Sequence, residues 1–466
     1  MEVDECLAPS NGNASDREEV MKKFLFFALL TQCIYAKELF KVEMIEEYFT
    51  ESNPFVYSAI AKEQRYKNKD MYYSGDLDNK LFLKYDKKDY PTSEGDFLDF
   101  GVEQPLENGI EMTLAYRKAD GTQETNNIKT GDEGEVRAGV KVPVFSVLKG
   151  MNPRKLNIDT ARLERKNLGF ESKNNLRILY FKTLSEYAKV LYYKAVIKLQ
   201  DELAYKAKKR RDIVKRKVLA GSVAQLALLE VEQQIINRQQ SLISSKNDFS
   251  YALENFLKYL NISRQTFDEK YSLDDLQNIE HEGVKLENYV ARAIQNRPDL
   301  KKYDIEIQKI QLEQKQTSLL NYPKMDLSLY GVHDFEYENG FKVALDIGFP
   351  IQRSKYDAKV LENKNSILAM QVDRDKEILT IRTNLLNIVN SLDTLERNLR
   401  SSEQEIQLLE KLEQAENKKY VLGMSNLFIL NQREIYTLDV KKKALKYNFE
   451  YLLLKQKAEI EAGLSL

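Results

Sequence analysis

The long stretches without a helix-breaking residue limit most strongly what this chain can fold into. No proline occurs between Arg154 and Arg297, or between Ile351 and the C-terminus. In the second stretch, mostly apolar residues recur in alternating steps of three and four, which is the seam of a coiled coil. The seam positions are Ile378, Ile381, Leu385, Ile388, Leu392, Leu395, Leu399, Ser402, Ile406 and Leu409. A helix from about residue 356 to 422 would be roughly 100 Å long, which suits a rod, a scaffold or the wall of a tube.

Other segments alternate apolar and polar residues with a period of two, which is typical of strands with one apolar face. They cover about residues 81–85, 97–104, 110–117 and 135–144 in the first half, and 325–330 and 341–349 in the second. Asn108-Gly109 predicts a hairpin between two of them. The apolar face could meet a second sheet in a soluble sandwich or lipid in an outer-membrane barrel, and alternation alone does not separate the two.

The N-terminal region predicts export. Residues 1–20 fit no targeting signal, so we interpret them as an extension upstream of a start at Met21. Residues 21–36 have a cationic start, an apolar run and a final small residue, Ala36, as a secretory signal peptide does. Cleavage there would remove both cysteines, Cys6 and Cys33. No later segment has eighteen uncharged apolar residues, so we expect a soluble periplasmic protein or a β-barrel, and the signal peptide favours the barrel.

The chain follows one plan twice. A proline opens a helical stretch in each half, and Gly221 and Gly423 follow long helical stretches about 200 residues apart. We expect repeat 1 to span residues 37–262, with strands within about 81–144 and long helices within about 154–262. A polar linker over residues 263–285 would lead to repeat 2 over residues 286–466, with strands within about 324–349 and long helices within about 353–463.

Composition argues against nucleic-acid binding and against catalysis. The chain has 71 Lys and Arg against 72 Asp and Glu, which excludes a strongly basic nucleic-acid binder. The histidines, His281 and His333, and the two cysteines are too few for common zinc or iron sites. Because both histidines are expected in loops, a nucleophile has no obvious base. We therefore predict no catalytic residue, no cofactor, no metal and no enzyme activity.

A dense basic run precedes Gly221. Its members are Lys206, Lys208, Lys209, Arg210, Arg211, Lys215, Arg216 and Lys217. The run could be a solvated helix face, a nucleic-acid patch, or a set of partners for acidic residues at similar distances before Gly423. On the last interpretation, Arg210 and Arg211 would pair with Glu410 and Glu413 on a neighbouring helix, or with an adaptor. Such exposed pairs are worth only about 0–1 kcal/mol each.

These motifs together resemble the TolC-type outer-membrane efflux proteins, over nearly the whole chain from about Asn53 to Gly463. Each motif is weak alone, and the resemblance depends on their order, spacing and repetition. The motifs are Asn296-Arg297-Pro298-Asp299-Leu300, Asn321-Tyr322-Pro323-Lys324-Met325-Asp326-Leu327, Ile347-Gly348-Phe349-Pro350 and the segments around the two glycines.

The resemblance implies a mixed α and β fold: a homotrimer whose outer-membrane β-barrel continues into a long α-helical coiled-coil barrel across the periplasm of a Gram-negative bacterium. It implies a passive exit duct of a tripartite efflux or type I secretion system, joined by a periplasmic adaptor (membrane fusion) protein and an inner-membrane transporter. Gly221, Ser222, Gly423 and Ser425 would be periplasmic tip turns that contact the adaptor, and Tyr420 would lie at the tunnel mouth. The alternative is a soluble periplasmic coiled-coil scaffold.

The chain departs from the family pattern at two places. Positions that carry acids at the tunnel mouth in some family members are Ala227, Ile429 and Gln432 here, and the arginine position is Ser425. An acidic ring and an arginine lock therefore cannot be carried over. The first half also has four alternating segments where the pattern commonly has two, and the extra pair could join the barrel wall or fold beside it.

Overall fold

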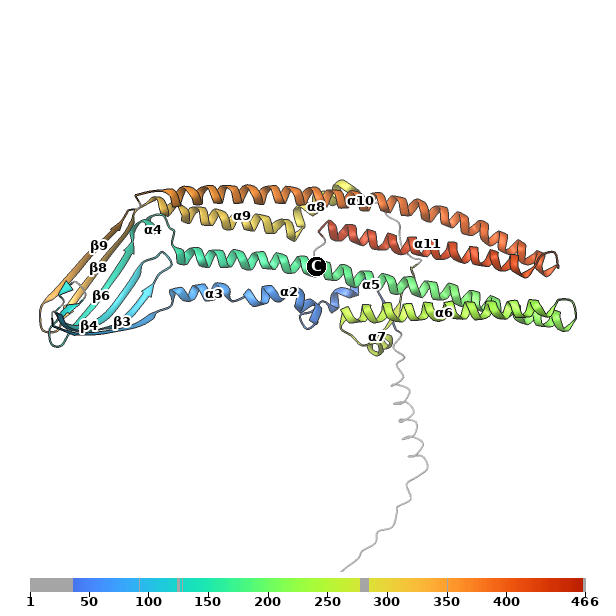
Figure 1. The fold of residues 1–466 in the computed structure, drawn as a ribbon, viewed down its shortest axis with the longest axis horizontal. Helices are drawn as coiled ribbons and strands as arrows, with labels where there is room; N and C mark the ends of the chain where they lie inside the picture. Colours follow the sequence, from blue (N-terminus) through green and yellow to red (C-terminus); the bar gives the residue numbers. More distant parts are fainter. Residues whose placement is uncertain are drawn as a thin grey trace, which may run out of the picture.

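The computed structural model describes residues 37–91, 93–123, 126–127, 129–276, 285–349 and 351–463. The extension and signal peptide predicted over residues 1–36, with both cysteines, lie outside these ranges, as does His281. The described chain is a long rod (Figure 1). A sheet lies at one end, and two helical hairpins reach the other end.

Two helices of nearly equal length form the frame of the rod. They are α5 and α10, with 67 and 68 residues, so each spans about 100 Å, the length that the sequence predicted for the second-half helix. Each folds back at its far end into a shorter partner, α6 or α11, and shorter helices lie along the half nearer the sheet (Figure 1). The helices are η1 (Val42–Tyr48), α2 (Pro54–Tyr66), α3 (Lys69–Ser74), η2 (Gly75–Leu77), α4 (Val144–Leu148), α5 (Pro153–Leu219), α6 (Gln225–Leu260), α7 (Arg264–Lys270), α8 (Leu286–Asn296), α9 (Pro298–Thr317), η4 (Ser318–Asn321), α10 (Ser354–Val421) and α11 (Leu427–Glu461).

Asparagine-proline pairs start two of the first-half helices. The side chain of Asn53 accepts a hydrogen bond from the Phe55 amide at the start of α2, at 3.0 Å, and Asn152 accepts one from Arg154 at the start of α5, at 2.8 Å. Proline suits the first helical position because its missing N–H would have no partner there. These caps fix where the helices leave the loop and the sheet.

The sheet is antiparallel and contains all the strand segments expected from the sequence. Six strands follow the order β2-β3-β4-β6-β8-β9, and a short β5 pairs with the end of β4. The first-half pair beyond the family pattern therefore joins the same sheet, and the hairpin predicted at Asn108-Gly109 connects β3 to β4, with Gly109 at φ 93°. The strands are β2 (Lys80–Tyr90), β3 (Ser93–Pro105), β4 (Glu111–Gln123), β5 (Asn126–Asn127), β6 (Glu135–Pro143), β8 (Lys324–Asp334) and β9 (Asn339–Gly348).

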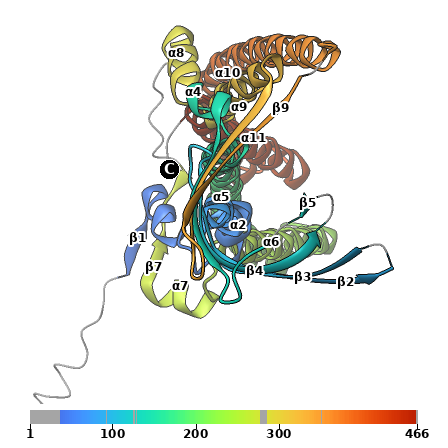
Figure 2. The ribbon, with the colours of Figure 1, turned by 90° about the vertical axis from the view of Figure 1, so that its left-hand side faces the viewer.

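The segment between the halves has more structure than a polar loop. After α7, strand β7 (Tyr271–Leu273) pairs in parallel with β1 (Glu38–Phe40) near the N-terminus (Figure 2). Tyr187 of α5 donates a hydrogen bond to the carbonyl oxygen of Phe40 at 2.7 Å, so this small sheet is held against the long helices. Residues 277–284 of the predicted linker lie outside the described ranges.

The apolar core is a chain of clusters along the rod. The largest cluster joins α5, α6 and the small sheet around Phe40, Tyr187, Phe256 and Phe267. Along α10, most of the predicted seam is buried, from Ile381 to Ser402. Its members pack against α8 and α9 nearer the sheet and against α11 further along. The heptad pattern therefore marks one seam that packs first against α8 and α9 and then against α11.

Candidate functional site: a two-faced sheet and a charged helical tip

The register of the sheet collects apolar side chains of all six strands on one face. One row across the sheet consists of Leu81, Val102, Leu114, Ala138, Gly331 and Phe341. At the two ends of this row, Leu81 is 86% exposed and Phe341 is 85% exposed. An apolar face of this extent marks a surface that meets lipid or another molecule.

The opposite face of the sheet carries a row of charges, of which Asp99, Glu135 and Asp334 are buried. Lys84, Asp99, Arg117, Glu135 and Asp334 face one another in a row across five strands. Arg117 pairs with Glu135 across the sheet. Arg137 of β6 donates to both carboxylate oxygens of Asp99, at 2.6 and 2.7 Å. One face is thus apolar and the other charged, which is the arrangement of a wall between lipid and water.

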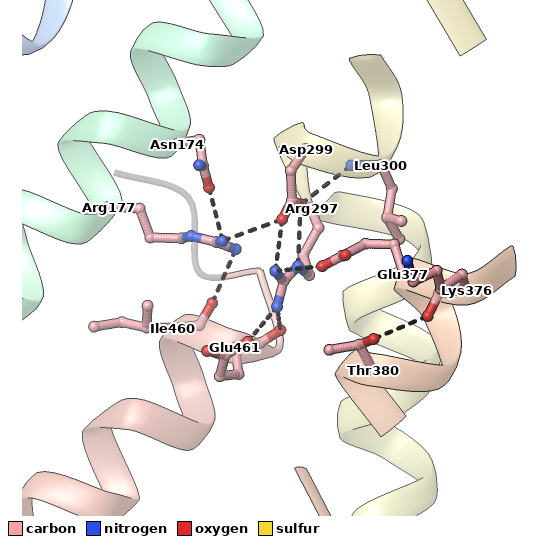
Figure 3. A network of polar contacts seen from close by, with 10 residues as sticks. All are labelled: Asn174, Arg177, Arg297, Asp299, Leu300, Lys376, Glu377, Thr380, Ile460 and Glu461. Atoms are coloured by element: carbon pink, nitrogen blue, oxygen red, sulfur yellow. Dashed lines mark hydrogen bonds and ion pairs between the residues drawn. The ribbon is translucent and has the colours of Figure 1, made fainter. Parts of the chain in front are cut away.

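Halfway along the rod, the Asn-Arg-Pro-Asp-Leu motif forms an ion network between helices (Figure 3). Arg297 donates to both oxygens of Asp299, at 3.0 and 2.6 Å, and pairs with Glu461 at the end of α11. Arg177 of α5 lies 3.7 Å from Asp299 and donates to the carbonyl oxygen of Ile460 at 3.3 Å. The motif therefore ties the start of α9 to α5 and α11.

Burial and neighbouring charges both shift the pKa values of groups in this network. Burial by itself would raise the pKa of Asp299, but its hydrogen bonds with Arg297 and the charges of Arg297 and Arg177 lower that pKa below its ordinary value. Burial and the nearby Arg297 lower the pKa of Arg177. The network holds the two halves of the chain together through desolvated charges, so its role is structural.

The two predicted tip turns share one geometry. Gly221 and Gly423 have φ of 71° and 77°, in the left-handed region that favours glycine. In each turn the glycine amide donates three residues back and the next amide five residues back, the pattern of a Schellman motif. Ser222 donates to the carbonyl oxygen of Lys217 at 2.9 Å, and Ser425 donates to Glu416. The same type of turn thus reverses the direction of the chain in both hairpins.

A buried charge triad lies about three helical turns deeper than these turns. Glu434 of α11 pairs with Arg210 of α5 and, at 3.0 Å, with Arg238 of α6. All three side chains are at least nine-tenths buried, and Arg238 also donates to Asn431 at 2.8 Å. Burial and the charge of Arg210 lower the pKa of Arg238, and the charges of Glu434 and Glu413 only partly offset that effect. One carboxylate therefore compensates two desolvated guanidinium groups that belong to the first hairpin.

The structure corrects the predicted charge pairs at the tip. Arg210 pairs with Glu434, and neither Glu410 nor Glu413 pairs with an arginine among the described residues. Glu413 accepts from Lys206 at 3.1 Å, and Glu410 pairs with Lys441 at 2.6 Å. Arg211 pairs with the adjacent Asp212, at 2.9 Å. The prediction compared heights along α5 and α10 only, whereas the face of α5 that carries Arg210 is turned toward α11.

Sequence reasoning missed Glu434 and Arg238, although a signal for Glu434 exists. Arg210 lies eleven residues before Gly221, and Glu434 lies eleven residues after Gly423. Since both hairpins turn at their glycine, equal separation places the two residues at the same height. Which helix faces would meet was not readable from this spacing.

Tyr420 lies inside the tip and packs there with apolar side chains of both hairpins. The cluster contains Val214, Val231 and Leu427, and the ammonium group of Lys217 lies 5.3 Å from the centre of the Tyr420 ring. Burial raises the pKa of the Tyr420 hydroxyl. Tyr420 thus links the hairpins within one chain.

The sheet end holds His333, whose ring nitrogen Nδ1 lies 2.6 Å from the side-chain oxygen of Asn339. Across the described ranges, no three His, Cys, Asp or Glu side chains are grouped so that they could hold a metal ion. Within the same ranges, none of the helices is both long and apolar enough to cross a bilayer.

Comparison with solved structures gives the fold. No family model and no curated protein sequence matches the chain. The outer-membrane channel OprN matches with a TM-score of 0.66 and 11% identity, over 91% of this chain and 89% of that one. The outer-membrane protein VceC of Vibrio cholerae matches with 0.66 and 10%, over 91% and 96%. The MtrE outer-membrane channel of Neisseria gonorrhoeae matches with 0.63 and 11%, over 91% and 88%. The chain has the fold of these outer-membrane channels.

Within this channel fold, the departures noted at the predicted tunnel mouth lie near the tip turns. Ala227 and Ile429 occupy the first turns of α6 and α11, and Ala227 packs against the cluster around Tyr420. Ser425 bonds within its own hairpin to Glu416. The buried Arg210–Glu434 pair, about three turns deeper, instead supplies a polar link between the hairpins.

Proposed function

We propose that this protein is the outer-membrane exit duct of a tripartite efflux or type I secretion system. The observation that carries the proposal is the six-stranded sheet with one exposed apolar face and one charged face, placed at the end of a helical rod about 100 Å long. Such a chain can line a water-filled path through lipid and extend it across the periplasm. The duct is passive, and an inner-membrane transporter supplies the energy.

The working unit is a homotrimer. Among the described residues, no strand covers the outer edge of β2 or of β9, and six strands are too few to close a wide barrel. Helix α10 also carries a second apolar stripe that its own chain leaves exposed. The stripe consists of Leu361, Leu368, Val372, Leu379 and Leu386. Neighbouring copies would cover both the strand edges and this stripe.

The hairpin tips are the contact for a periplasmic adaptor protein. Apolar side chains remain exposed around the turns at Gly221–Ser222 and Gly423–Ser425. They include Leu219, Leu226, Val421, Leu422, Met424 and Phe428. An exposed apolar patch at the end of a rod suits a partner that presents a complementary helical tip.

Fractionation tests the proposal against a soluble periplasmic scaffold. We expect the protein in the outer-membrane fraction, soluble only in detergent and with the mass of three chains. A monomer that leaves with the soluble periplasm would contradict the duct. A deletion strain that accumulates toxic compounds, restored by the intact gene and not by a variant lacking both tip turns, would support export.

A further inference from the structure

We propose that the extra hairpin β2–β3 is part of the barrel wall, and that β2 of one copy pairs with β9 of the next. Three copies with six strands each would then enclose an eighteen-stranded barrel. This inference rests on the proposed trimer and adds to it the strands that join the copies. The partner of each sheet edge is a second copy of this chain.

The first support is the continuity of the sheet through β2 and β3. The ladder between β3 and β4 pairs every residue from Gly95 to Pro105 with one from Glu111 to Gly121, without a break. Leu81 and Leu83 on β2 share the apolar face of the other strands. A hairpin folded beside the barrel would bury these side chains on its own chain, whereas both are at least 70% exposed.

The second support is the length of the two strands. Strand β2 has 11 residues and β3 has 13, compared with 11 in β8 and 10 in β9. A tilted membrane-spanning strand needs about 9–11 residues. The extra hairpin is therefore as well suited to span the bilayer as the strands of the second half.

The third support is that the two outer edges are complementary. Strand β2 runs away from the helices and β9 runs back to α10, so the two edges are antiparallel. If the first residue of β2 and the last residue of β9 lie level with each other at the helical side of the sheet, Lys80 faces Gly348. This register brings together Leu81 with Ile347, Leu83 with Leu345 and Tyr85 with Val343 on the apolar face, and Asp86 with Lys342 on the polar face. A register shifted by one residue would place apolar side chains of one strand beside polar side chains of the other.

The same register gives an acceptable barrel geometry. The row that starts at Lys80 crosses the sheet to Lys342, and Gly348 lies six residues further along β9. With about 3.4 Å per residue and about 4.8 Å between strands, six residues of stagger over six strands give a tilt of about 35°. Closed barrels tilt their strands by about 35–45°. A stagger of four residues would give only about 25°.

Disulfide trapping in the intact protein tests the inference. The double variant Leu83→Cys with Leu345→Cys, and separately Tyr85→Cys with Val343→Cys, should give species of two and three chain masses after oxidation in isolated outer membranes. Reductant should return them to one chain mass. The matched control Leu83→Cys with Ala344→Cys places one thiol on the opposite face, and it should give little cross-linking, as should each single variant.

Two outcomes overturn the inference and are distinguishable from failure of the duct itself. If the variants purify as trimers but Leu83→Cys cross-links with no cysteine at positions 341, 343, 345 or 347, the wall does not close through β2. Cross-linking of Leu114→Cys with Leu345→Cys would instead make β4 the joining edge, with the extra hairpin outside the wall. If the protein is not a membrane trimer, the proposed function fails as well.

Discussion

The helices α5 and α10 have almost the same length and the same place in their repeats, yet they are buried very differently. Of the 67 residues of α5, 21 are buried, whereas 8 of the 68 residues of α10 are. Helix α5 packs against α2, α6, α9 and α11, so it is the centre of the single chain. Helix α10 buries one seam and leaves its second apolar stripe exposed. The difference fits the proposed trimer, in which repeat 2 would present a surface to another copy while repeat 1 holds the protomer together.

The largest expected effect on stability comes from the charge triad, which joins the two hairpins. In the variant Glu434→Ala, Arg210 and Arg238 would stay buried without a counter-charge, which costs about 3–5 kcal/mol. We expect a lower urea midpoint of the purified protein and faster proteolysis at the tips. The control Glu410→Ala removes an exposed partner of Lys441 and should cost less than about 1 kcal/mol. Equal effects of the two variants would show that the triad does not join the hairpins.

Substitutions of two leucines at neighbouring heights distinguish the roles of the two apolar stripes of α10. Leu385 in the seam is fully buried, whereas Leu379 in the second stripe is 65% exposed. Leu385→Ala should lower the free energy of unfolding by about 2–5 kcal/mol. Leu379→Glu should leave the fold of one chain intact but weaken the trimer, measured by mass in detergent at decreasing protein concentration. A stable trimer of Leu379→Glu would mean that the second stripe does not face another copy.

The ion network at Asp299 joins the two repeats and predicts a pH dependence. Because the folded-state pKa of Asp299 is lowered, its carboxylate stabilises the fold above its unfolded pKa near 3.8, and the contribution disappears as the pH falls through the folded value. Asp299→Asn should cost about 1–3 kcal/mol at pH 7. The difference in the free energy of unfolding between wild type and variant, measured with urea, should become smaller below about pH 4. If this difference in free energy were unchanged at pH 3, the ionised carboxylate of Asp299 would not be the stabilising group.

The smallest expected effect tests whether the two tips are equivalent. At Gly221 and at Gly423, an added Cβ would meet no atom of the described residues within 4 Å, so the cost of alanine is backbone strain alone. Each Gly→Ala variant should lose about 1–2 kcal/mol, and each Gly→Asn variant less. Thermal unfolding of the two alanine variants should shift equally. A larger loss at one position would indicate contacts made only in the assembled protein.

Much of the architecture was readable because it depends on local periodicity. The seam from Ile381 to Ser402 and the alternating segments each specify an element together with the face that it buries, since side-chain direction follows from helix or strand geometry. The turns at Gly221 and Gly423 were readable because glycine is favoured at positive φ. The short strand β7 was not readable, because its partner β1 lies more than 200 residues away in the sequence.

By itself, then, the sequence determined two long helical hairpins, six two-faced strands and the glycines at which the hairpins turn. Only the tertiary structure decided which helix faces oppose one another. It paired Arg210 with Glu434, assigned the Asn-Arg-Pro-Asp-Leu motif to a joint between the repeats, and placed the extra hairpin in the main sheet. The reason is physical: periodicity fixes the direction of a side chain relative to its own helix or strand, whereas a partner distant in sequence depends on how whole elements pack.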